Sequence, residues 1–194
     1  VPQYTFSIPY RHEKIRVGYI SPDFRRNVMQ NFIQPLLTAY DRARFEIYVY
    51  STAEESDEVT AALRPYADVW RDVGEASPAE TAARIRADEI DVLVDLAGHA
   101  AGGALPVLAR RPAPVQMLGL GYTATSGLRA VDAFLTDAVC DPPGAGHERY
   151  FTEKLVRLPS QFCYVPPAHL PASEGTPARR RGYILFGVFN QYRK

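Results

Sequence analysis

At 194 residues the chain is long enough for one sizeable core, and its 46% apolar and 23% charged content is ordinary for a globular protein. Equal numbers of basic and acidic residues, 22 of each, give no net positive field that would indicate binding to nucleic acid or to an anionic membrane. The longest apolar runs are far too short to cross a bilayer, so the sequence predicts neither a membrane nor a nucleic-acid partner.

Strands and helices alternate along the first half of the chain. Dense apolar runs, partly β-branched, predict strands, and apolar side chains at helical spacing predict helices. The expected elements are a strand at 14–21, a helix from about 27 to 40, a strand at 45–51, a helix from 56 to 63, a short strand at 69–73 and a helix from 77 to about 88. Asn27 can cap the first helix, and Pro35 predicts a kink or a late start in it. Ser77, Pro78 and Glu80 form the capping box that opens the last one.

The second half continues this alternation more clearly. The run DVLVDLAG predicts a buried strand at 91–98 that enters the small loop HAAGG. The expected elements after it are a short helix at 105–109 and strands at 115–121, 133–137 and 153–159. Apolar strands separated by helices indicate parallel pairing through right-handed crossovers, with helices on both faces. We therefore predict an α/β fold: a mostly parallel, doubly wound, Rossmann-like sheet.

The composition changes toward both ends of the chain. Residues 1–13 precede the first strand and are expected to form an N-terminal extension of a domain at 14–160. Residues 161–182 are rich in Pro, Ala and Arg, which is typical of a linker. The apolar run from Tyr183 to Phe189 then predicts a further strand, with which the chain either closes the domain or begins a second one.

The loops that follow the strands are the candidates for a site, because ligands of open parallel sheets bind beyond the carboxyl ends of the strands. The loop after the first strand reads SPDFRRN and lacks G-x-G-x-x-G, since the one nearby glycine, Gly18, lies inside the strand; this argues against an unrelated NAD enzyme. Three other loops, GHAAGG, GYTATSG and the terminal FNQYRK, offer flexible glycines, hydroxyls, and amide or cationic donors that suit a sugar or a diphosphate. A tight turn, a capped turn and a solvated helix start explain them equally well.

Cysteines and histidines give little sign of a metal or a disulfide. Cys140 and Cys163 are the only cysteines and form no C-x-x-C pair, which predicts neither a zinc site nor a disulfide framework. This usage is typical of a reducing cytosol, so we expect core thiols in a cytoplasmic protein. His12, His147 and His169 stand in polar or Pro-rich surroundings and are expected to face solvent.

Several segments, taken in order, carry a family resemblance. KIRVGYISPDF, FEIYVYS, DVLVDLAGHAAG, RRPAPVQ, GYTATSG, YFTEKLVRLP and FNQYRK resemble the catalytic region of the O-linked N-acetylglucosamine transferase family, glycosyltransferase family 41, including its bacterial and SPINDLY-type members. The match covers most of residues 14–194. The resemblance implies a GT-B architecture, in which two Rossmann-like domains face a cleft, usually after tetratricopeptide repeats. It further implies that this chain is the N-terminal half of the catalytic region and that residues 183–194 begin a truncated C-terminal, donor-binding domain.

The resemblance also implies a chemistry. Members of the family are similar in being inverting transferases that pass a sugar, N-acetylglucosamine from UDP-GlcNAc, to a Ser or Thr hydroxyl of a protein, with no metal or other cofactor. The expected partners are the nucleotide sugar, a protein or peptide acceptor, and the missing C-terminal domain, without which this piece is expected to be inactive. By the same resemblance Gln191 and Lys194 lie at the donor, with the lysine near the diphosphate. Leu120 and Gly121 border the sugar pocket.

The loop after the central strand, made of Gly98, His99 and Ala100, borders the active site by the same comparison. His99 is a titratable candidate for the group that removes the hydroxyl proton, since the reference pKa of histidine is about 6.5. A purely structural hydrogen-bonding role is the alternative for this side chain.

Two segments depart from the family pattern. The family's D-F-x-x-H segment ends here in Asn27, whose amide can orient a substrate but cannot accept a proton near neutral pH. Asn27 is therefore a site residue or a plain helix cap. The family's GYPGTSG turn has Thr123 and Ala124 in place of its proline and glycine, which leaves the sugar identity open. A binding or scaffolding module that has lost catalysis is the alternative function.

Overall fold

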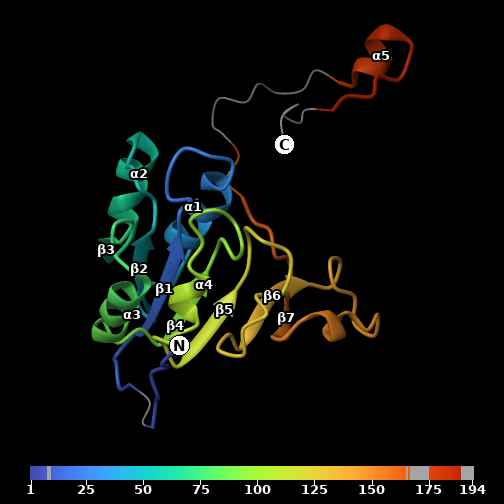
Figure 1. The fold of residues 1–194 in the computed structure, drawn as a ribbon. Coiled ribbons are helices and arrows are strands. Elements are labelled where there is room, and N and C mark those ends of the chain that lie inside the picture. Colours follow the sequence, from blue (N-terminus) through green and yellow to red (C-terminus); the bar gives the residue numbers. More distant parts are fainter. Residues whose placement is uncertain (8–9, 165, 167–174, 189–194) are drawn as a thin grey trace.

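The centre of the computed structural model is one sheet of seven parallel strands (Figure 1). The structure describes residues 1–7, 10–164, 166 and 175–188. The strands are β1 (Ile15–Ser21), β2 (Phe45–Ser51), β3 (Val69–Asp72), β4 (Val92–Asp95), β5 (Val115–Leu118), β6 (Ala133–Asp137) and β7 (Lys154–Leu158). They stand in the order β3-β2-β1-β4-β5-β6-β7, and all neighbouring pairs are parallel. The predicted doubly wound, Rossmann-like fold is confirmed.

Helices connect the strands, and local sequence fixes where two of them begin. The helices are α1 (Gln30–Thr38), α2 (Glu58–Leu63), α3 (Pro78–Ala87), α4 (Leu105–Leu108) and α5 (Pro177–Arg181), with 3₁₀ turns at Arg64–Tyr66 and His147–Tyr150. The Asp57 carboxylate caps α2 by accepting the N–H groups of Val59 and Thr60 at 2.9 and 3.0 Å. At α3, Ser77 Oγ accepts the N–H of Glu80 and the Glu80 carboxylate accepts the N–H of Ser77, so the predicted capping box is confirmed.

Helix α1 begins later than the position of Asn27 predicts. The Asn27 side-chain oxygen accepts the N–H of Met29 at 2.8 Å and closes a turn in front of the helix, whose first residue is Gln30. Pro35 lies inside α1, where its missing N–H removes one bond from the helical ladder. Asn27 therefore stabilises the turn that precedes the helix and does not cap its first turn.

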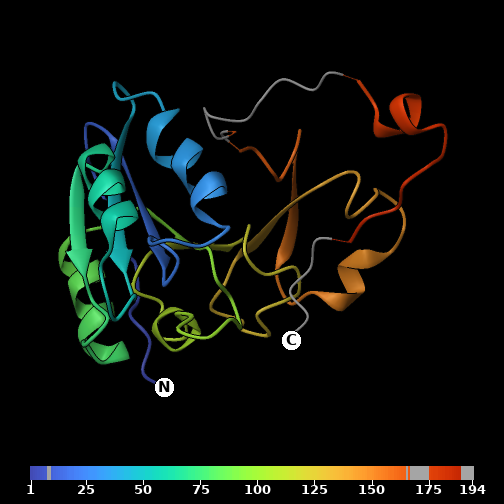
Figure 2. The ribbon, with the colours of Figure 1, turned by 90° about the horizontal axis from the view of Figure 1, so that it is seen from above.

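The strands bury apolar side chains on both faces of the sheet. The layer under α3 and α4 includes Ile20, Tyr50, Ile85, Leu93, Leu108 and Leu118. The layer under α1 and α2 includes Ile33, Leu37, Val49, Leu63, Val94 and Leu96. Figure 2 shows α1 and α4 on opposite sides of the sheet. Cover on both faces is what a parallel sheet needs, and it explains why the strands read as nearly continuous apolar runs.

The direction in which strands are added to the sheet reverses beside β1. Strands β2 and β3 lie on one side of β1, and β4 to β7 lie on the other. The loops after β1 and β4 therefore leave the sheet toward opposite sides. A ligand crevice forms at such a switch point in open α/β sheets, beyond the carboxyl ends of the strands. The fold therefore predicts that a ligand would bind at these two loops and their neighbours.

The segment after β7 differs from its prediction. Residues 183–188 form no strand and are exposed, and no strand in the described part of the chain lies beside them. An apolar run without a neighbouring strand cannot complete the hydrogen bonds of a sheet. Helix α5 lies within the predicted linker and buries no residue. The domain boundaries proposed from the sequence stay predictions.

The burial of the cysteines was predicted wrongly. Cys140 and Cys163 are both exposed free thiols rather than core residues. Cys140 lies in the turn after β6, where its N–H is held by the Asp137 side chain at 2.8 Å. An isolated cysteine in a polar turn has no apolar surroundings to bury it. Within the described residues no helix is long and apolar enough to cross a bilayer.

The burial of His12 was also predicted wrongly. Its side chain is only 11% exposed, and its ring nitrogens lie 3.0 Å from Asp91 Oδ2 and 3.1 Å from Glu89 Oε2. Both carboxylates come from the turn before β4, which the polar sequence around His12 does not reveal. His147 is partly exposed and pairs with Asp141, and His169 lies outside the described residues.

Candidate functional site

Four loops meet at the carboxyl edge of the sheet, around the switch point. Thr52, after β2, donates its hydroxyl to the carbonyl of Gly102 at 2.8 Å, and Pro22, after β1, packs against the same glycine. Gly121, after β5, donates its N–H to the carbonyl of Leu96 at 3.0 Å. The loops after β1, β2, β4 and β5 therefore form one connected surface.

The loop after β4 is built on a buried carboxylate. Asp95, the last residue of β4, has no exposed surface, and its Oδ1 accepts the N–H groups of Ala97 and Gly98 at 2.8 and 3.2 Å. Burial raises the pKa of Asp95 to about 6, although these two N–H groups and the charge of His99 oppose the rise. The strand ends here, earlier than the predicted residue 98, because the next N–H groups turn back to this side chain.

The turn that follows is compact. Gly98 has a φ of +54°, and a Cβ at this position would come within 2.7 Å of Tyr122 Cβ. Only glycine satisfies both the left-handed backbone and this close approach. Ala100 is exposed and donates its N–H to the carbonyl of Ala97 at 3.0 Å, which closes the turn.

His99 stands exposed on this turn. Its Nε2 lies 3.2 Å from the carbonyl oxygen of Thr125, and its ring centroid lies 5.2 Å from that of Tyr122. A carbonyl oxygen can only accept a hydrogen bond, so the network assigns the proton of the neutral ring to Nε2. Nδ1 then holds the lone pair and is the nitrogen that can accept a proton.

Leu120 and Gly121 lie where the loop after β5 crosses the end of β4. A Cβ at Gly121 would overlap the carbonyl oxygen of Leu96, and the methyl group of Met29 lies 3.3 Å from the same point. Leu120 has a φ of 75°, a conformation that non-glycine residues seldom adopt. Gly121 therefore adjoins the loops after both β1 and β4.

Asn27 lies in the loop after β1, and both ends of its amide have partners. Its Nδ2 donates to Asp23 Oδ1 at 2.8 Å, and its Oδ1 accepts the N–H of Met29 at 2.8 Å. Burial raises the pKa of Asp23, although hydrogen bonds from Asn27 and Ser21 oppose the rise. These contacts give Asn27 a structural role in the loop after β1.

A second buried carboxylate, Glu153, holds the GYTATSG loop. Its Oε2 accepts the hydroxyl of Thr125 at 2.7 Å, and its Oε1 accepts the hydroxyl of Ser126 and the Ser126 N–H, the latter at 2.8 Å. Burial acts to raise the pKa of Glu153, but the hydrogen bonds from Ser126 and Thr125 lower it overall. Ionised Glu153 thus fixes the segment whose carbonyl accepts from His99.

Most of the predicted site residues lie on this connected surface. Those that lie in the connected loops are Asn27, Gly98, His99, Ala100, Leu120 and Gly121. Gln191 and Lys194 lie outside the described residues. Sequence reasoning missed Asp95 and Glu153. A signal existed for Asp95, since a single carboxylate at the end of an apolar strand needs a specific reason for its burial.

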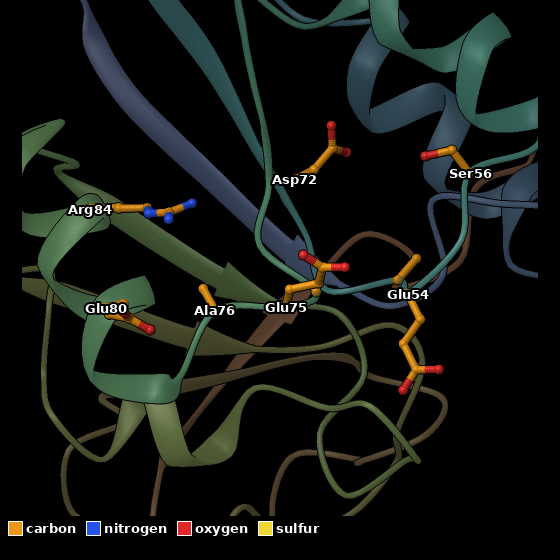
Figure 3. Close-up of a pocket in the computed structure, with 9 residues that line it drawn as sticks. Glu54, Ser56, Asp72, Glu75, Ala76, Glu80 and Arg84 are labelled. Atoms are coloured by element: carbon orange, nitrogen blue, oxygen red, sulfur yellow. The ribbon is translucent and has the colours of Figure 1, made fainter.

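A pocket of about 510 Å³ opens at the same edge, beyond β2 and β3, as Figure 3 shows. It is lined by Ala53, Glu54, Ser56, Asp72, Gly74, Glu75, Ala76, Glu80 and Arg84. Two of its carboxylates have structural partners, since Asp72 accepts from Arg64 and Glu80 accepts from Ser77. None of the predicted site residues lines this pocket. In the described part of the chain, no three His, Cys, Asp or Glu side chains are grouped to hold a metal ion.

Fold and loops together define a class of protein. A doubly wound parallel sheet whose loops meet at its switch point is the Rossmann-like architecture of one half of a GT-B glycosyltransferase. Residues 2–168 match the family described as Glycosyl transferase family 41. The chain belongs to this family, and the resemblance drawn from its motifs is confirmed.

Relatives and a solved structure agree with this assignment. The chain is 38% identical to the probable UDP-N-acetylglucosamine–peptide N-acetylglucosaminyltransferase SPINDLY of Arabidopsis thaliana, over 100% of this chain and 22% of the relative. It is 30% identical to the UDP-N-acetylglucosamine–peptide N-acetylglucosaminyltransferase of Caenorhabditis elegans, over 77% of this chain and 13% of the relative. An O-GlcNAc transferase mutant of Thermobaculum terrenum matches with a TM-score of 0.79 and 39% identity, over 89% of this chain and 33% of that one. The chain thus spans at most 22% of the length of these two curated relatives.

Proposed function

We propose that the intact protein is an inverting glycosyltransferase that moves N-acetylglucosamine from UDP-GlcNAc to a Ser or Thr hydroxyl of a protein. Membership of glycosyl transferase family 41 supports the proposal, as do the activities named for the relatives from Arabidopsis thaliana and Caenorhabditis elegans. Because this chain spans about a fifth of such a relative, it supplies one wall of the cleft. A C-terminal, donor-binding domain supplies the other wall, and the 194 residues alone are inactive.

The observation that carries the proposal is the placement of His99 at the switch point, with its Nε2 held by the Thr125 carbonyl at 3.2 Å. In the transfer, the acceptor oxygen bonds to the anomeric carbon while the bond from that carbon to the diphosphate oxygen breaks. The electron pair of the broken bond leaves with UDP, and the hydroxyl proton passes to His99 Nδ1. Gly98 and Gly121 allow the loops after β4 and β5 to pack closely here, since a Cβ at either position would meet atoms of the other loop.

The leaving diphosphate needs its own stabilisation. We assign this to the amide of Gln191 and the ammonium of Lys194, which would donate charge-assisted hydrogen bonds to the phosphate oxygens without a metal or other cofactor. We propose the cytosol as the compartment, because the two exposed, unpaired cysteines suit a reducing environment. The partners in this scheme are the nucleotide sugar and a protein or peptide acceptor.

One observation favours a second candidate function, a binding or scaffolding module without catalysis. The amide of Asn27 is used by Asp23 and Met29, so the position where the family pattern has a histidine carries no proton acceptor in this chain. If the family reaction depends on that position alone, the crevice would bind ligands without turning them over.

The two candidates are separated by an activity screen. The intact protein is incubated with a panel of UDP- and GDP-sugars and Ser/Thr peptides, and sugar addition is read from the peptide mass. We expect transfer from UDP-GlcNAc, and a rate that falls on the order of 10²-fold or more in His99→Ala. His147→Ala is the matched control and keeps the rate. Transfer from any donor ends the scaffold hypothesis, and full rates in both His99→Ala and Asn27→Ala contradict the site assignment.

A further inference from the structure

Asp95 occupies an unusual place for a charged residue. It follows an apolar run, Val92 to Val94, at the end of a strand in the middle of the sheet, and it has no exposed surface. Its backbone pairs with Ile20 on one side and Leu118 on the other, both fully buried. A carboxylate in such surroundings is costly unless its oxygens are matched by donors or by positive charge.

Only one of the two carboxylate oxygens is matched. Oδ1 accepts the N–H groups of Ala97 and Gly98, and these bonds set the turn that carries His99. Oδ2 is buried and has no hydrogen-bond partner among the residues that the structure describes. The turn therefore uses one oxygen and leaves the other one free.

The turn alone does not require a carboxylate. An asparagine carbonyl oxygen at this position would accept the same two N–H groups, and it would avoid the burial of a charge. The presence of an aspartate instead of an asparagine therefore implies that the negative charge itself has a function. The side-chain charge that lowers the pKa of Asp95 is that of protonated His99, four residues further along the chain. That histidine is also the side chain that Asp95 positions.

We propose that Asp95 is a positioning residue of the transfer reaction: it fixes the Gly98–His99 turn through Oδ1 and supplies a buried negative charge that stabilises His99 after it has taken the acceptor proton. The inference rests on the proposed function. When the hydroxyl proton moves to Nδ1, the ring gains a positive charge in a crevice from which substrate excludes water. A fixed anion below the turn offsets that charge without reorganisation.

Asp137 is a matched control from the same sheet. It ends β6 as Asp95 ends β4, and its Oδ1 likewise accepts two N–H groups, those of Val139 and Cys140, at 2.9 and 2.8 Å. Its second oxygen has a partner, because Oδ2 accepts the N–H of Gln161 at 2.9 Å. Replacement of Asp137 by asparagine therefore removes a strand-end carboxylate of the same local design that does not face His99.

The test uses the intact protein, with UDP-GlcNAc and a Ser/Thr peptide as substrates. Asp95→Asn keeps the acceptor for the turn and removes the charge. We expect its kcat to fall at least 10-fold at neutral pH, with the KM for UDP-GlcNAc within about twofold of the wild-type value. Asp137→Asn keeps kcat. Because the anion stabilises protonated His99, the decline of the rate at acid pH should set in at a lower pH in Asp95→Asn than in the wild type.

The double variant Asp95→Asn/His99→Ala decides whether the two residues act together. We expect it to be no slower than His99→Ala, because the charge has nothing to stabilise once the imidazole is gone. Multiplicative losses would show that Asp95 acts independently of His99 and would overturn the proposal. An unchanged kcat in Asp95→Asn across pH 5.5 to 8 would overturn it as well.

A second readout separates this inference from the proposed function. The carboxyl ¹³C signal of Asp95, assigned through Asp95→Asn, reports its titration in the absence of any substrate. Because the charge of His99 opposes the rise in the pKa of Asp95, His99→Ala is expected to raise that pKa further. If the wild-type protein transfers no sugar but this shift is seen, the proposed function fails and the Asp95–His99 coupling stands. If the pKa of Asp95 does not change, the coupling itself is refuted.

Discussion

The β4–β5 side and the β6–β7 side of the carboxyl edge use similar residues with different results. On the first side a Cβ at Gly98 or Gly121 would collide with the neighbouring loop. On the second side a Cβ at Gly144 or Gly146 would meet no atom within 4 Å. Burial raises the pKa of Asp95, while backbone hydrogen bonds from Gln161 and Cys140 lower the pKa of Asp137. Close packing and an unmatched carboxylate therefore coincide at the switch point, and this difference points to function.

Replacement of a closely packed glycine by alanine is expected to have the largest effect on stability. Gly121→Ala would force a methyl group into the carbonyl oxygen of Leu96, and we expect a loss of about 3 kcal/mol or more in the free energy of unfolding. Gly144→Ala meets open space and carries only the penalty of its φ of +81°, about 1 kcal/mol. Denaturant titration of both variants checks this. Equal losses would show that the two sides of the edge are packed alike.

The two aspartates are expected to give opposite pH dependences of stability. The pKa of Asp95 is raised to about 6, so its ionisation destabilises the fold as pH rises from about 4 to 6, by at most about 3 kcal/mol. The pKa of Asp137 is lowered, so its contribution is present above the ordinary aspartate pKa and is lost as pH falls.

Denaturation midpoints at several pH values test this contrast in wild type, Asp95→Asn and Asp137→Asn. Relative to Asp95→Asn, the wild type should lose stability between pH 4 and 6. Relative to Asp137→Asn, it should gain stability as pH rises from acid values. Slopes of the same sign in both comparisons would contradict the electrostatic difference between the two strand ends.

Glu153 joins the two sides of the edge, since it precedes β7 and holds the loop after β5. Glu153→Ala removes the acceptor for the Thr125 hydroxyl and for the Ser126 N–H, and we expect it to cost about 2 kcal/mol. Glu148→Ala breaks an exposed ion pair with Arg157 and should cost less than Glu153→Ala. Thermal unfolding measures both, and a smaller loss for Glu153→Ala than for Glu148→Ala would refute this anchoring role.

The smallest effect is expected at the opposite, amino edge of the sheet, around His12. Burial acts to lower the pKa of His12, but hydrogen bonds to Asp91 and Glu89 raise it overall. The ion pairs therefore stabilise the fold fully below about pH 6.5, and this contribution disappears as pH rises through the raised pKa. His12→Asn should cost at most about 1 kcal/mol at pH 6 and less at pH 9. A larger cost at pH 9 than at pH 6 would contradict this pH dependence.

Local patterns in the sequence predicted most of the fold. The runs at 45–51 and 133–137 are strands with the expected bounds, and the capping box at Ser77 and Glu80 opens α3 as predicted. These features depend on neighbours in the chain, which the sequence displays directly. The convergence of the loops after β4 and β5 followed from parallel topology, which places the carboxyl ends of all strands at one edge.

What the sequence did not reveal depends on contacts between distant residues. His12 and Asp91 are 79 positions apart, and Glu153 lies 27 positions from Ser126. Nothing in the local composition around His12 indicates two carboxylates from another turn. Likewise, the exposure of the cysteines follows from turns whose packing is decided in three dimensions. Asp95 was predicted only in part. The buried strand at 91–98 includes it, but the sequence did not reveal that one of its carboxylate oxygens is hydrogen-bonded and the other is not.

Leu120 has a consequence for how the crevice is presented to a ligand. Its φ of 75° costs a non-glycine residue on the order of 1–2 kcal/mol, and its side chain recovers part of that cost by packing on the layer under α1 and α2. A glycine would relieve the backbone but would free the loop. The leucine instead restricts the loop to one shape, so the crevice is pre-organised and a sugar entering it would lose less conformational entropy on binding.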